Sequence, residues 1–166
     1  MNYAGAVWLS GAGLPTVLNC GFYGNAATWG GGIYAQFPAL TATVANCTFS
    51  GNSATNYGGA WQASASALNA MNCVLWDNRA GMGGAEIYTS GGAGTTVVAW
   101  CDVKGGWNGT GVGAGSGGTN LSGGGNIDSD PLFVGGTNGA WSGGPIFDPT
   151  NFQSTLLDAL GGWFDN

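Results

Sequence analysis

The chain has 166 residues, enough for one domain with a useful core, and only 6% of them are charged, against about 25% in ordinary globular domains. Arg79 and Lys104 are its only basic residues and the net charge is −6, which argues against nucleic-acid partners and against attraction to an anionic membrane surface. No apolar run reaches the ~18 residues that suggest a membrane-spanning helix, and no signal peptide is recognisable at Met1. The 35 glycines would suit a disordered chain, but eight Trp, seven Phe and five Tyr indicate a chain that folds.

An internal repeat organises the first hundred residues. The run NCGFYGNAA at 19–27 returns as NCTFSGNSA at 46–54 and NCVLWDNRA at 72–80, and it degenerates to WCDVKG at 100–105. Successive cysteines are therefore 27, 26 and 28 residues apart. A second, shorter unit recurs between these runs, as GAVW at 5–8, GIY at 32–34, GAW at 59–61 and EIY at 86–88.

Each run alternates with the period of two that a β-strand requires. Cys20 and Phe22 share one face, and the Gly-Asn or Asp-Asn pair that follows each strand is a turn signal in which Asn can adopt the left-handed conformation. Short strands separated by turns at a period near 27 residues indicate a solenoid with about three strands per coil. The sequence therefore predicts an all-β fold, a right-handed parallel β-helix (β-solenoid) of about four to six coils.

Stacked coils place equivalent residues about 4.7–4.9 Å apart, which predicts ladders of identical side chains. We expect a core ladder of Cys20, Cys47, Cys73 and Cys101, and a turn ladder of Asn25, Asn52 and Asn78. Asparagines stacked in this way bond amide to amide. Because the chain has no CxxC pair and no histidine, an ordinary zinc site is disfavoured. The cysteines are expected to be reduced thiols that act as small hydrophobes, with one or two disulfides, or a metal or redox site, as the alternatives.

The rung pattern Asn-Cys-Thr-Phe-Ser-Gly-Asn-Ser-Ala at 46–54 resembles the right-handed parallel β-helix repeats of bacterial surface and secreted proteins, which include polymorphic outer-membrane-protein-like and pectate-lyase-like repeat proteins. The segments 101–107 and 125–134 resemble the closing module of such domains. In that family a Ser-Pro-x-x-Asp-x-Gly element usually follows, and the nearest match here, at 154–161, lacks the proline and adds a residue. The resemblance implies the fold and an extracellular or cell-surface location, but the fold hosts lyases, hydrolases, adhesins and passive stalks alike.

Enzymes of this fold need clustered or paired carboxylates. In this chain acidic residues lie close to the two basic residues. Asp77 and Arg79 fall on one rung and Asp102 and Lys104 on the next, close enough for ion pairs. We expect a small surface charge cluster there rather than a lyase site. Asp128 and Asp130 are expected in turn and capping roles, with Ca²⁺ as an alternative that two carboxylates alone would not satisfy. No catalytic residue, cofactor or metal ligand is assigned.

A column of aromatic residues is the expected surface feature. Trp8, Tyr34, Trp61 and Tyr88 take the same place in successive units, each after a better core candidate, so their rings should point outward. A row of exposed rings suggests a contact surface. The alternatives are stacking under the chain's own loops, packing against another chain, and glycan binding.

The whole chain is expected to be one domain, with repeat coils at 1–104, a flexible Gly-rich loop at 105–127 and a closing coil or cap at 128–166, including a short helix or strand at 151–160. The first rung begins by Gly5 with nothing above it, and an uncapped strand edge favours pairing with another copy. The sequence therefore predicts a non-enzymatic, extracellular structural or adhesive protein that self-associates end to end through its first coil, as a filament or as part of a surface stalk. The alternative is a domain that binds or degrades polysaccharide.

Overall fold

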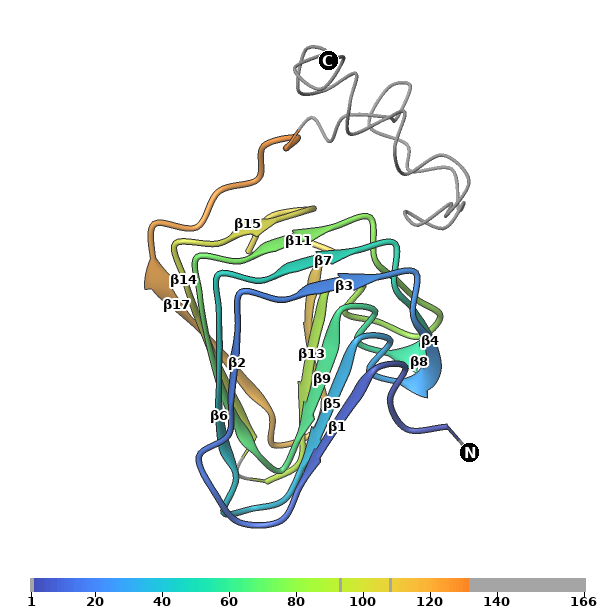
Figure 1. The fold of residues 1–166 in the computed structure, drawn as a ribbon, viewed down its shortest axis with the longest axis vertical. Coiled ribbons are helices and arrows are strands. Elements are labelled where there is room, and N and C mark those ends of the chain that lie inside the picture. The colour runs from blue at the N-terminus through green and yellow to red at the C-terminus, as the bar shows by residue number, and fades with distance from the viewer. Residues whose placement is uncertain (1, 93, 108, 132–166) are drawn as a thin grey trace, which may run out of the picture.

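A computed structural model describes residues 2–92, 94–107 and 109–131. In this part of the chain every regular element is a β-strand, and the 17 strands form four parallel sheets. The segments predicted as most of the closing cap, 132–166, lie outside the described residues. Seen along the stack, successive coils trace nested outlines of nearly the same shape (Figure 1). The fold is an all-β parallel solenoid of about four turns, as the repeat predicted.

Each sheet gathers the equivalent strands of successive coils. The first sheet contains β1 (Val7–Ser10), β5 (Ile33–Gln36), β9 (Trp61–Ser64), β13 (Ile87–Ser90) and β16 (Val112–Ala114). The second contains β2 (Thr16–Leu18), β6 (Thr41–Ala45), β10 (Ala67–Met71), β14 (Thr95–Ala99) and β17 (Thr119–Gly124). The third contains β3 (Gly21–Tyr23), β7 (Thr48–Ser50), β11 (Val74–Trp76) and β15 (Asp102–Val103). The fourth contains β4 (Ala26–Trp29), β8 (Ser53–Tyr57) and β12 (Arg79–Ala80).

The first three coils thus have four strands each, one more than the three expected. The first coil comprises β1 to β4, and the fifth coil, defined here as β16, β17 and residues 125–127, is partial. In Figure 1 the β4 and β8 strands lie outside the outline formed by the other three sheets.

The corners of each coil depend on residues with positive φ. Asn19, Asn46, Asn72 and Trp100 have φ between 53° and 56° at the corner between the second and third sheets. At the next corner the residues with positive φ are Gly24, Gly51 and Asp77. The prediction that Asn25, Asn52 and Asn78 adopt this conformation is wrong. The residue before each of them has the positive φ, and the amide side chains turn into the corner.

Aromatic and aliphatic side chains fill the interior. The rings of Phe22 and Phe49 are stacked, with centroids 4.5 Å apart and planes inclined by 2°. Trp61 packs its ring against Phe49 edge to face at 5.2 Å, and Leu75 and Val103 continue the phenylalanine column. Equivalent residues of successive coils are therefore in contact along the stack, as the predicted ladders require.

The expected outward orientation of Trp61 is wrong. Trp61 is 0% exposed and pairs with Ile33 on one side and Ile87 on the other, in the interior column. Ala60 takes the place of Gly32, because the Gly32 N–H donates to the Ala60 carbonyl at 2.9 Å. Trp61 is thus equivalent to Ile33 and not, as predicted, to Tyr34. A shift of one residue exchanges the two faces of a strand.

The expected flexible loop at 105–127 is also wrong, because this segment forms the fifth coil. β16 pairs with β13, and β17 pairs with β14. The glycines permit close packing rather than mobility. A Cβ on Gly115 would lie 2.6 Å from the Tyr88 hydroxyl, and one on Gly113 would lie 2.9 Å from the Gly84 nitrogen.

Trp8 and Trp61, which both lie in the first sheet, provide a test of this register. Trp61→Ala should lower the free energy of unfolding by about 3–5 kcal/mol, because it opens a cavity in the core. Trp8→Ala should cost about 1 kcal/mol, because it removes an exposed ring that stacks on one neighbour. Urea unfolding of both variants would measure the difference, and equal losses would contradict the assigned register.

Candidate functional site

The cysteine column lies inside the solenoid except at its first member. Cys47, Cys73 and Cys101 are each 1% exposed, whereas Cys20 is exposed, and all four are free thiols. The Cys20 N–H donates to the Cys47 sulfur at 3.4 Å, and the Cys73 N–H donates to the Cys101 sulfur at 3.3 Å. Each thiol in turn donates to the carbonyl two residues earlier. Burial raises the pKa of the Cys47 thiol, as expected of an uncharged core residue.

The asparagine ladder runs along the next corner in one direction. Asn52 Oδ1 accepts from the Asn25 N–H at 3.0 Å and from Asn25 Nδ2 at 2.8 Å. Asn78 Oδ1 accepts in the same way from the Asn52 N–H and Nδ2, at 2.9 and 2.8 Å. The Nδ2 groups of Asn52 and Asn78 also donate to carbonyls of the preceding coils, those of Phe22 and Phe49. Every coil therefore supplies acceptors for the donors of the coil before it.

Glu86 ends this ladder. Its Oε1 accepts from the Asn78 N–H at 3.3 Å and its Oε2 accepts from Asn78 Nδ2. Glu86 belongs to the column of Gly32 and Ala60, so a carboxyl group replaces a small residue and reaches the ladder. The sequence signal for this role is a single Glu at a position that glycine or alanine holds in the coils before it. No role was predicted for Glu86.

Burial raises the pKa of Glu86 to about 8, although its hydrogen bonds with Asn78 lower it. The side chain is 1% exposed and lies beside a pocket of about 370 Å³ that Asp77, Arg79 and Lys104 also line. Lys104 forms an ion pair with Asp77 and lies 5.3 Å from the centre of the Trp76 ring. Each Glu86 oxygen thus accepts a hydrogen bond from Asn78, and the carboxyl group ends the ladder.

Of the expected cluster of Asp77, Arg79, Asp102 and Lys104, the structure shows the ion pair of Asp77 with Lys104 on the next rung. Asp102 accepts from the Ser129 N–H at 3.1 Å, and Asp128 accepts from the Gly105 N–H at 3.2 Å, which are turn contacts of the kind predicted for this segment. The described residues contain no group of three or more His, Cys, Asp or Glu that could hold a metal ion.

The aromatic column is largely covered by the chain itself. Trp8 is 56% exposed but Tyr34 is only 4% exposed, because Tyr34 lies between Trp8 and Gln62 in the column. The Tyr3 ring lies 5.5 Å from both aromatic rings. Tyr88 stacks on Tyr57 at 4.1 Å, and Gln62 holds the intervening place in the column. The predicted row of exposed rings is thus reduced to Trp8, and most of the column follows the alternative in which rings stack under the chain's own segments.

The first coil presents strand edges that nothing covers among the described residues. β1, β2 and β3 are the terminal strands of their sheets, and their outer edges are called here the first-coil edge. Only β4 is covered, because the Thr28 N–H donates to the Asn2 carbonyl at 2.8 Å. Segment 2–5 is thus a partial cover that the sequence analysis did not foresee.

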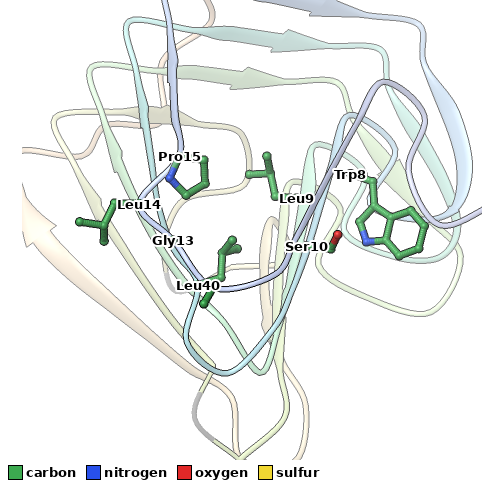
Figure 2. Close-up of a pocket in the computed structure, with 8 residues that line it drawn as sticks. Trp8, Leu9, Ser10, Gly13, Leu14, Pro15 and Leu40 are labelled. Atoms are coloured by element: carbon green, nitrogen blue, oxygen red, sulfur yellow. The ribbon is translucent and has the colours of Figure 1, made fainter.

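A pocket of about 480 Å³ opens inside the first coil (Figure 2). Leu9, Pro15 and Leu40 point into the open coil, whereas the Trp8 ring lies outside it. Leu9 is only half-buried and Leu40 is buried. This pocket is the end of the apolar interior, and the side chains of a further coil would fill it.

Both ladders are incomplete at the first-coil edge. Cys47 Sγ and Asn52 Oδ1 accept from the coil before them, but within the described residues no donor reaches the equivalent atoms, Cys20 Sγ and Asn25 Oδ1. The first coil thus carries the same ladder residues as the internal coils.

Comparisons of the chain with protein-family models, curated proteins and solved structures found no match. No helix in the part of the chain that the structure describes could span a membrane.

Glu86 gives a testable pH dependence. Because its folded pKa is raised from 4.5 to about 8, its contribution to stability is complete below pH 4.5 and is lost as the pH rises through 8. The free energy of unfolding should therefore fall by up to about 1.4 kcal/mol per pH unit across this interval. Glu86→Gln, which resembles the protonated acid, should flatten the profile measured by urea unfolding.

Glu86→Ala is the control for this measurement. It removes the acceptor of the Asn78 N–H and one of the acceptors of Asn78 Nδ2, and it should lower the stability below pH 4.5, again without the slope. A wild-type slope that persists in Glu86→Gln would show that another group titrates.

Proposed function

We propose that this chain is a non-enzymatic structural or adhesive β-solenoid that associates by adding a further coil at the first-coil edge. The observation that carries the proposal is the incomplete pair of ladders, with Cys20 Sγ and Asn25 Oδ1 placed as acceptors beside three strand edges that no described residue pairs. A β-strand edge is a template for another strand. Side-chain acceptors at the same positions add specificity to that template.

The first-coil edge also lacks the usual protection against pairing. Natural edge strands carry charged residues, bulges or covering segments. Here the first charged side chain in the sequence is Asp77, so the first two coils have no side-chain ion to repel another chain. Half-buried apolar residues of the first coil, Val7, Leu9 and Val17, already pack against the core on one side, and a further coil would bury their other side.

A structural role accords with the arrangement of the acidic residues. General acid–base catalysis needs a group within hydrogen-bond reach of its substrate, whereas Glu86 is buried with both oxygens bonded to Asn78, and Asp77 is paired with Lys104. An extracellular location, and binding of glycans through exposed Trp8, stay predictions.

A proline at the free edge tests the proposal. Pro15 O accepts from Thr43 N and Asn19 N donates to Ala45 O, so the odd-numbered residues of this segment direct their backbone groups to β6 and the Leu18 N–H points to the free edge. Leu18→Pro removes that donor and should shift the population toward single chains, since proline blocks an edge with little cost to the sheet.

Light scattering coupled to size exclusion, over a hundredfold range of protein concentration, would measure the association. Leu18→Thr is the matched control, because it changes the same side chain and keeps the N–H. A wild-type chain that stays a monomer throughout would refute the proposed assembly.

A further inference from the structure

An amine and a carboxyl group from adjacent coils are in contact on the outside of the solenoid. Asp77 follows β11 in the third coil and Lys104 follows β15 in the fourth, and these two strands pair. Lys104 Nζ donates to Asp77 Oδ1 and lies 5.3 Å from the centre of the Trp76 ring. One of the two basic residues of the chain is therefore placed with its nitrogen directly against a carboxyl group.

The backbone at Asp77 holds this carboxyl group in an unusual place. Asp77 has a φ of 60°, and the equivalent residues of the two preceding coils, Gly24 and Gly51, are glycines. A side chain in this left-handed conformation has a steric cost that glycine avoids. The Asp77 side chain is 14% exposed, against 45% for Lys104, so the carboxyl group is the more sheltered of the two partners.

A second carboxyl group lies beside the pair. Glu86 lines the pocket of about 370 Å³ that Asp77 and Lys104 also line. Burial raises the pKa of Glu86 to about 8, its hydrogen bonds with Asn78 lower it, and the charges of Asp77 and Lys104 shift it further in opposite directions. Glu86 is therefore mostly a neutral acid at pH 7, which can give one proton and take another. Its burial keeps it from a substrate outside the chain, but Asp77 and Lys104 share its pocket.

We propose that Lys104 and Asp77 join in an isopeptide bond that cross-links the third and fourth coils. A proton of the Lys104 ammonium first passes to the Asp77 carboxylate, which leaves a neutral amine and a neutral acid. The amine nitrogen then attacks Asp77 Cγ as a nucleophile. A C–N bond forms, one C–O bond of Asp77 breaks, and the departing oxygen leaves as water. The reaction is a condensation, so it needs no oxidant, reductant or further reactant.

Glu86 moves the second proton of this reaction. It takes the proton that the nitrogen loses after the attack and gives its own proton to the departing oxygen, so it ends in its starting state. Contact between the two reacting groups replaces an encounter between separate molecules, which is a large source of acceleration. The bond forms once per chain and within the chain, so it does not depend on the association proposed above.

The mass of the purified, denatured chain tests the bond. The cross-linked chain should weigh one water molecule less than its sequence. Lys104→Arg is the matched control, because the guanidinium keeps the ion pair but is too weak a nucleophile to form the amide, and this variant should have its full mass. Glu86→Gln keeps an acceptor for Asn78 but cannot transfer the proton. It should slow bond formation about 100-fold or more, so that chains of full mass accumulate.

Trypsin locates the bond, because the chain offers it only Arg79 and Lys104. The unlinked chain should yield the peptides 1–79, 80–104 and 105–166. A cross-linked Lys104 is not cleaved, so segments 1–79 and 80–166 should stay joined after complete digestion.

A wild-type chain that has its full mass and yields the three separate peptides would overturn the proposal, and so would a loss of water without joined segments. Complete cross-linking in Glu86→Gln would overturn the role of Glu86.

Discussion

Stacking in register is the constraint on which the rest of this structure depends. Each inward side chain contacts its counterparts in the coils above and below, about 4.8 Å away, so a polar group fits a ladder best if it can both donate to one neighbour and accept from the other. An amide satisfies this condition, as Asn52 does between Asn25 and Asn78. A thiol beside a backbone N–H satisfies it more weakly. At the end of the ladder, Asn78 needs a group that accepts its hydrogen bonds without belonging to a further asparagine, and the Glu86 carboxyl group is that acceptor.

The periodic features could be predicted from the sequence because stacking converts a repeat directly into contacts. The cysteine and asparagine ladders follow from spacing alone, and so does the phenylalanine column. Features that depend on an irregular strand could not be predicted in the same way. Trp61 follows a glycine and an alanine much as Tyr34 follows a glycine and an isoleucine. However, β8 has one extra residue between Ala54 and Tyr57, at the register shift in its pairing with β4, and this places the Trp61 ring inside. The glycines of 105–127 have the composition of a linker, and only their closeness to Tyr88 explains their role in packing.

At the candidate site, the uncovered first coil was foreseen from the position of the first rung, whereas the cover that segment 2–5 gives to β4 depends on contacts between residues far apart in the sequence. The polar side chains of the fifth coil were not foreseen either. Ser122, Asn120 and Asn126 lie among glycines, where strand periodicity is hard to recognise. The place of Ser122 and Asn120 emerges only from the pairing of β17 with β14, and that of Asn126 from its hydrogen bond with the Cys101 N–H.

The end of the asparagine ladder has a consequence for how such a chain could lengthen. Coils two and three make the same upward and downward contacts, and a duplicated segment of one period placed between them would meet matching acceptors and donors on both sides. A duplication placed after Glu86 would not, because Gly106 follows the positive-φ Gly105 where the earlier coils have an asparagine after Gly24, Gly51 or Asp77. Gene duplication could therefore extend this protein from its middle, with the carboxyl group marking the last coil of the repeated part.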